Sequence, residues 1–154
     1  MASVERSDLP SQSLLHDYVQ PGDYLDSYSC ASTLDVDRVA ERAMAFPGWV
    51  MLLLGLRNLL VAPLGLTGRP KGGRVGIFPL DQRSANELIL GFNDRHLDFR
   101  VSVLVDGRRV YGSTWVHPHN FSGRAYFATI KPFHILIMRQ AVGRAAGSGV
   151  TSPR

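Results

Sequence analysis

The chain contains very little cysteine, since Cys30 is the single one among 154 residues. One cysteine excludes an internal disulfide and a cysteine-based zinc site, so the composition gives no reason to place the protein in an oxidising compartment. The first ten residues carry acidic side chains and no apolar segment, which disfavours a secretory signal or a transit peptide. We therefore expect a cytoplasmic protein.

Uninterrupted hydrophobic runs are also missing. The most apolar stretch, residues 49–66, contains Arg57 and Asn58 near its middle and Pro63 near its end. A charged side chain at the centre of a bilayer is costly, so we expect a buried amphipathic helix here and no membrane insertion.

Basic charge is present but dispersed. The net charge is +4 and the pI is about 9.6, yet no four basic residues follow one another. Dispersed charge is typical of a solvated surface rather than of a phosphate-binding track, so we do not expect nucleic-acid binding. No nucleotide, flavin or phosphate-binding fingerprint occurs in the sequence, and we expect no cofactor.

The chain has an ordinary globular composition, with 45% hydrophobic and 19% charged residues. At this length the composition predicts one domain with its own core. Polar residues dominate the start of the chain, and small and polar residues dominate its end. We expect a flexible N-terminal arm over residues 1–21, a single α+β domain over residues 22–146 and a disordered tail over residues 147–154.

The predicted elements run in the order strand, two short helices, antiparallel sheet and long C-terminal helix. Pro132 lies inside the last helix and should kink or split it. The predicted bounds are a strand over 24–32, a helix to about 45 capped by Thr33 or Asp35, a helix over 49–61, a strand over 74–80, and a last helix that starts after Asn120 or Ser122 and ends near 146.

Residues 87–119 predict a three-stranded antiparallel meander. Turns at 94–95 and 106–107 would join its strands, because the second dipeptide, Asp-Gly, supplies the positive φ angles of a two-residue hairpin loop. Counting from these turns sets residue 93 opposite 96, 90 opposite 99, 105 opposite 108 and 99 opposite 114. One face is then apolar or small, with Leu88, Leu90, Phe92, Leu97, Phe99, Val101, Val103, Val105, Val110, Thr114 and Val116.

The other face of the meander is mixed and carries the candidate catalytic residues. In the predicted register His96 is opposite His117, and Asp98 is opposite Trp115. One interpretation makes His96 and Asp98 a proton-transfer pair beside Trp115. The alternative is a salt-bridged outer face without catalysis.

The same face raises two further possibilities. His119 lies on the same face as His96 and His117, and three histidines on neighbouring strands could bind zinc. Asp98 is the one acidic residue beside them that could act as a fourth ligand, and we expect no metal. Two large aromatic residues, Tyr111 and Trp115, would be exposed there, which is typical of a homodimer surface or of a second ligand-contacting surface.

Aromatic and apolar residues on the other elements could line a cavity between the sheet and the helices. The alternative is a solid core, which periodicity does not distinguish from a cavity wall. The polar ends of Tyr28, Tyr126 and His134 would orient a mostly apolar ligand there. The expected ligand contacts are Tyr28, Trp49, Leu53, Phe78, Leu90, Phe92, Phe99, Val101, Tyr126, Ile130, Phe133, His134 and Met138.

Three segments of the chain resemble a bacterial domain family of unknown function. They are residues 57–66 (RNLLVAPLGL), residues 91–100 (GFNDRHLDFR), and the helix containing GRAY at 123–126 and IKPFH at 130–134. The family looks related to the START, polyketide-cyclase and birch-pollen-allergen (SRPBCC) superfamily, and the resemblance covers about residues 22–142. It implies a helix-grip fold, in which a curved antiparallel sheet wraps around a C-terminal helix and leaves a hydrophobic cavity.

The superfamily includes lipid carriers, hormone receptors and polyketide cyclases, so the fold does not fix the function. We expect a cofactor-independent cyclase that encloses a polyketide- or polyene-like molecule and promotes its ring closure by positioning, for example in a pericyclic cycloaddition. The alternatives are a non-catalytic lipid or metabolite carrier of the same fold, and an interaction module that binds a partner chain through Tyr111 and Trp115.

Overall fold

An antiparallel sheet forms the centre of the protein in a computed structural model that describes residues 3–52, 74–75, 78–93 and 95–146. The order of its strands is β1-β2-β7-β6-β5-β4-β3. The strands are β1 (Glu5–Arg6), β2 (Tyr24–Ala31), β3 (Arg74–Val75), β4 (Phe78–Arg83), β5 (Glu87–Asn93), β6 (Leu97–Asp106) and β7 (Arg109–Pro118).

The helices are a short 3-10 helix η1 (Leu14–Asp17), α1 (Val36–Ala43) and the 25-residue α3 (Phe121–Ala145). Residues 48–52 are also helical. The rest of the helix predicted over 49–61 lies outside the described residues, as does the tail predicted over 147–154. The architecture confirms the α+β class, with an antiparallel sheet followed by a long C-terminal helix.

The predicted meander is present, but its register was wrong by two residues. Asn93 pairs with Asp98 rather than with residue 96, and Val105 pairs with Val110 rather than with residue 108. The second turn consists of residues 107–108, with Gly107 at φ +59°, so its centre lies one residue later than predicted. Because side chains alternate with a period of two, this shift leaves every residue on its predicted face.

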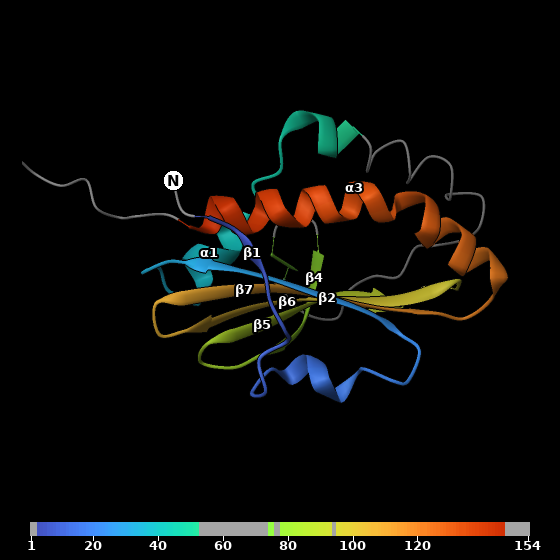
Figure 1. Ribbon diagram of the computed structural model, residues 1–154, viewed down its shortest axis with the longest axis horizontal. Coiled ribbons are helices and arrows are strands. Elements are labelled where there is room, and N and C mark those ends of the chain that lie inside the picture. Colours follow the sequence, from blue (N-terminus) through green and yellow to red (C-terminus); the bar gives the residue numbers. More distant parts are fainter. Residues whose placement is uncertain (1–2, 53–73, 76–77, 94, 147–154) are drawn as a thin grey trace, which may run out of the picture.

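Helix α3 covers the predicted apolar face (Figure 1). Towards the C-terminal end of the helix, Met138 and Val142 pack with a core that includes Leu90 and Val103. Towards its N-terminal end, Phe127 packs against the other end of the sheet. Complete burial of each such side chain contributes about 1.5–3 kcal/mol, so this layer is the main source of stability.

At the start of α1 and of α3, one of the two predicted capping residues acts as the cap. Asp35 caps α1 by accepting a hydrogen bond from the backbone N–H of Arg38, and Asn120 caps α3 in the same way with Gly123. Pro132 does not split α3, which is continuous through Ala145 and bends towards its N-terminal end (Figure 1). None of the described helices combines the length and the apolar character that a membrane crossing requires.

The later part of the N-terminal segment, which includes η1, packs on the second face of the sheet, opposite α3 (Figure 1), whereas Val4 at its start packs with the core beneath α3. Strand β1 is the edge strand and pairs with β2, and Leu15 of η1 is fully buried against Ile89 and Trp115. Residues of the arm predicted over 1–21 therefore make specific contacts with the sheet. The segment has few apolar residues, and these pack against a small apolar patch on the mixed face that contains Ile89 and Trp115.

A buried carboxylate fixes this segment in place. Glu87 on β5 is 1% exposed and accepts hydrogen bonds from the Ser13 hydroxyl at 2.6 Å, the Leu14 backbone N–H at 2.8 Å and the Ser102 hydroxyl at 2.5 Å. Two of these donors belong to the start of η1. Each of its two oxygens has at least one donor, which is what a carboxylate needs when it is removed from water.

Replacing Glu87 should loosen the N-terminal segment. In Glu87→Gln an amide nitrogen replaces one carboxylate oxygen, and the group that donated to that oxygen loses its acceptor. We therefore expect a loss of about 1–3 kcal/mol in the free energy of unfolding. Chemical denaturation measures this loss, and limited proteolysis should show faster cleavage within residues 3–20. The exposed Glu41→Gln is the matched control and should stay within about 0.5 kcal/mol of the wild type. Equal stability of the two variants would contradict the anchoring role.

Candidate functional site

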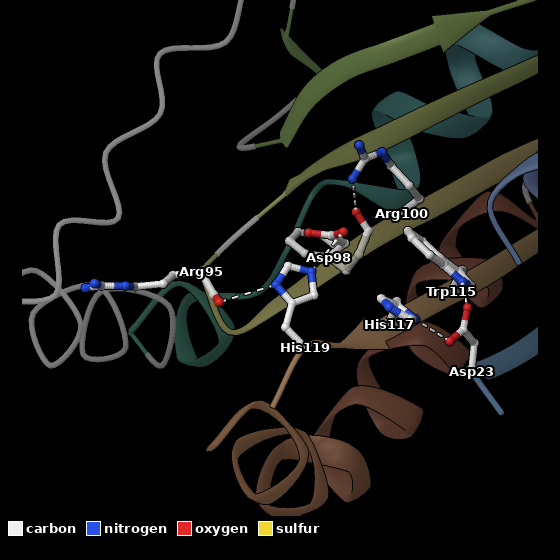
Figure 2. A network of polar contacts seen from close by, with 8 residues as sticks. Asp23, Arg95, Asp98, Arg100, Trp115, His117 and His119 are labelled. Carbon is white, nitrogen blue, oxygen red and sulfur yellow. Dashed lines mark hydrogen bonds and ion pairs between the residues drawn. The ribbon is translucent and has the colours of Figure 1, made fainter. Parts of the chain in front are cut away.

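The residues predicted to be catalytic lie on the second face, near the ends of β6 and β7 (Figure 2). Asp98 pairs with His117 in the observed register, not with Trp115. Its carboxylate lies 3.0 Å from Nε2 of His119, just beyond β7. His96 is not opposite His117 as predicted, and its backbone carbonyl instead accepts a hydrogen bond from the N–H of His119.

Trp115 belongs to a different group of contacts. It is 4% exposed, its indole N–H donates to Asp23 at 2.7 Å, and His117 Nδ1 lies 2.5 Å from the other oxygen of Asp23 (Figure 2). The ring also contacts Tyr18, which covers it from the N-terminal segment. The prediction that Trp115 is an exposed aromatic was therefore wrong. The segment that covers it could not be assigned from local sequence patterns.

Asp23 is held as an anion. Burial alone would raise its pKa, but hydrogen bonds from His117 and Trp115 and from the backbone of Gln20 outweigh burial and hold the pKa below the usual value of 3.8. Asp81 behaves similarly, because hydrogen bonds from Tyr18 and Arg100 outweigh its desolvation and lower its pKa. Both carboxylates therefore connect the N-terminal part of the chain to the sheet.

The second face is thus mainly a set of structural ion pairs and hydrogen bonds beneath a covering segment. Two polar atoms there, His96 Nδ1 and Asp98 Oδ1, are buried without a hydrogen bond to any described residue. Over the described ranges, no three histidine, cysteine, aspartate or glutamate side chains are grouped so that they could hold a metal ion.

A second polar group lies on the other side of the sheet, beneath α3. Alternate residues of β2 point towards this helix, and among them Tyr24, Asp26 and Tyr28 interrupt an otherwise apolar layer. Asp26 is 3% exposed. The Tyr24 hydroxyl donates to its Oδ2 at 2.6 Å, and His134 of α3 places Nε2 3.4 Å from the same oxygen. Thr114 is the pairing partner of Asp26 on β7 and is 2% exposed.

These four residues, Tyr24, Asp26, Thr114 and His134, are called the interlayer cluster below. Three of its buried polar atoms, Asp26 Oδ1, Thr114 Oγ1 and His134 Nε2, have no hydrogen-bond partner among the described residues. They come from two strands and a helix that are far apart in the sequence. Natural proteins leave few buried polar groups unpaired, so these atoms make the interlayer cluster the candidate site of this layer.

The surroundings of the interlayer cluster are aromatic and apolar. The rings of Tyr24 and Phe127 have centroids 4.6 Å apart, and Phe127 also contacts the ring of His134. Val116 and Ile130 belong to the same packed group. Burial raises the pKa of Tyr24 and Tyr28, with Asp26 adding to the effect, so both phenols stay protonated and can donate hydrogen bonds.

Most of the predicted ligand contacts lie in the layer between the sheet and α3. Two do not, because Trp49 is 39% exposed and Phe133 is 53% exposed. Leu53 lies outside the described residues. Those within or bordering the layer are Tyr28, Phe78, Leu90, Phe92, Phe99, Val101, Tyr126, Ile130, His134 and Met138.

Sequence reasoning missed Tyr24, Asp26 and Thr114. The available signal was the charge of Asp26 at an inward position of a strand whose alternate residues are Tyr24, Tyr28 and Cys30. Thr114 was assigned to the correct face but treated as a small core residue. Its proximity to Asp26 depends on the pairing of β2 with β7, which local patterns do not specify.

The fold and the interlayer cluster define an α+β protein with a polar group between an antiparallel sheet and its C-terminal helix. Residues 19–141 match the profile of a family described as "Protein of unknown function (DUF2867)", and the chain belongs to this family. The search of curated proteins gave no match. No solved structure matched the chain either.

Acid should weaken the attachment of the N-terminal part of the chain to the sheet. The pKa of Asp23 is lowered in the folded state, so its stabilising contribution is present above the unfolded pKa and is lost as the pH falls through the folded pKa. We expect the free energy of unfolding to decrease as the pH is lowered from about 5 to about 2. The decrease should be less steep in Asp23→Asn than in the wild type. Urea denaturation across this range measures both slopes.

The exposed Asp8→Asn is the control for this measurement and should keep the slope of the wild type. The same slope in Asp23→Asn and in the wild type would show that Asp23 does not couple folding to protonation.

Proposed function

We propose that the protein encloses a mostly apolar small molecule between the sheet and α3 and promotes its cyclisation without a cofactor. The observation that carries the proposal is that Asp26 Oδ1 and Thr114 Oγ1 are buried inside an aromatic layer without a hydrogen-bond partner among the described residues. A sheet that wraps a C-terminal helix also fits a helix-grip protein of the START and polyketide-cyclase type.

The proposal includes a bound molecule because unpaired buried polar groups are energetically costly. An unsatisfied buried donor or acceptor costs about 1–3 kcal/mol, and a charged group costs more. Asp26 would therefore destabilise the apolar layer unless an occupant supplied the missing hydrogen bond. A ligand with a polar group at one end and an apolar body would fit both the cluster and its surroundings.

Cyclisation is proposed because a layer that encloses a flexible chain would hold this chain in a folded conformation. Positioning the two ends of such a chain lowers the entropic part of the barrier, and a pericyclic step needs little beyond shape and a few hydrogen bonds. A polyketide- or polyene-like chain fits these requirements. The proposed site uses Asp26 and His134, whereas His96, Asp98 and Trp115 lie on the opposite face.

A non-catalytic carrier is the second candidate, supported by the same cluster. Asp26, Thr114 and His134 could simply hold the polar end of a lipid or metabolite while the aromatic layer covers the rest. The two candidates differ in whether the bound molecule leaves with a new ring.

Native mass spectrometry of the purified protein tests enclosure of a ligand. We expect a co-purified apolar molecule that is lost under denaturing conditions, and we expect Thr114→Val to reduce its occupancy about tenfold while the fold is retained. Thr129→Val is the matched control, because the Thr129 hydroxyl bonds to a carbonyl on the exposed surface of α3. Comparing the extracted molecule with its linear precursor distinguishes a cyclase from a carrier.

The protein can also be expressed in a host that makes polyketides and examined under gentle conditions. Finding no bound molecule in that experiment would contradict the proposal. So would equal occupancy in Thr114→Val and Thr129→Val, because the interlayer cluster would then play no part in binding.

A further inference from the structure

The unused hydrogen-bonding capacity of the interlayer cluster indicates what kind of group would fill it. Asp26 Oδ2 already accepts from Tyr24 and lies near His134, whereas Oδ1 accepts from no described residue. A carboxylate oxygen is an acceptor, so the missing partner must donate a hydrogen bond. A ketone, an ester or an ether would leave Oδ1 unpaired.

Thr114 adds a second requirement. It is paired with Asp26 across β2 and β7, and its buried Oγ1 has no partner within the described part of the chain. A hydroxyl both donates and accepts. One hydroxyl group of a ligand can therefore donate to Asp26 Oδ1 and accept from Thr114, which satisfies both atoms at once.

Charge around the cluster favours an uncharged ligand. On α3, the Lys131 ammonium lies 5.2 Å from the centre of the Tyr24 ring, and the Arg139 guanidinium lies 5.8 Å from the centre of the Tyr28 ring. A ligand ammonium would be attracted by Asp26 but repelled by these two cations, and it has no acceptor for the Thr114 hydroxyl. A ligand carboxylate would face Asp26 inside an apolar layer, where like charges repel strongly.

We propose that the interlayer cluster binds the hydroxyl group of an uncharged, otherwise apolar ligand, with Asp26 Oδ1 as the acceptor and Thr114 as the donor. An enol hydroxyl presents the same hydrogen-bonding groups as an alcohol and is included. This inference rests on the proposed function, because it specifies the polar end of the enclosed molecule.

Four probes with the same eight-carbon chain test the inference. They are 1-octanol, 1-methoxyoctane, octylammonium and octanoate, each titrated into the ¹⁵N-labelled full chain and followed by NMR. We expect 1-octanol to bind about tenfold more tightly than the other three, because it alone is uncharged and donates a hydrogen bond. The shifted amides should include those of β2 and β7 around Asp26 and Thr114.

Asp26→Asn removes the acceptor. Tyr24 holds the amide oxygen, so the amide nitrogen takes the place of Oδ1, and a nitrogen donor does not accept from an alcohol. Because the amide N–H can donate to an alcohol oxygen or to an ether oxygen, we expect 1-octanol to lose its tenfold preference over 1-methoxyoctane. Asp37→Asn, which alters an exposed carboxylate paired with Arg83, should leave this preference unchanged. Thr114→Val, which conserves shape, gives the same test if Asp26→Asn does not fold.

Each remaining outcome overturns the inference in a distinguishable way. Equal binding of 1-octanol and 1-methoxyoctane at the cluster would reject the hydroxyl but keep the enclosed ligand. Tighter binding of octylammonium or octanoate would replace the uncharged group with an ion. Failure of all four probes to shift the cluster would reject the site, and a ligand-free protein by mass spectrometry would then reject the proposed function as well.

Discussion

A carboxylate that leaves water must receive hydrogen bonds from the protein, and Glu87, Asp23 and Asp26 are buried carboxylates of this kind. Glu87 receives three donors, and Asp23 receives three, from Trp115, His117 and the backbone of Gln20. Asp26 receives one from Tyr24 and has His134 at a longer distance. Both oxygens of Glu87 and of Asp23 therefore receive hydrogen bonds, whereas Oδ1 of Asp26 receives none from a described residue.

The same constraint explains how the two faces of the sheet differ. The face under α3 is closed by apolar packing, which needs no specific partners. The opposite face is closed by a segment with few apolar residues, whose exposed backbone donors need acceptors. Glu87 supplies acceptors to the start of η1, and Asp23 supplies them at the junction with β2. A mixed face is thus suited to a polar covering segment as well as to solvent.

The faces of the sheet could be predicted from the sequence, because alternation is local and survives a register error of two residues. The caps Asp35 and Asn120 were also local signals. The covering of the second face was not predictable in this way, because it depends on contacts between residues 13–18 and strands more than 60 residues later, such as Ser13 with Glu87. The interlayer cluster depends on the pairing of β2 with β7 and on the turn of α3 that carries His134, which are equally non-local.

The position of the interlayer cluster links occupancy to stability. Asp26 and Thr114 belong to the sheet and His134 belongs to α3, so a molecule that satisfies all three joins the two layers. A ligand that binds only the folded state stabilises it in proportion to the logarithm of its saturation. Under the proposed function, the protein without its ligand bears the cost of leaving Asp26 Oδ1 and Thr114 Oγ1 unpaired at the interface on which its stability mainly depends. Binding would remove that cost, so the polar atoms that weaken the layer when it is empty would strengthen it when it is filled.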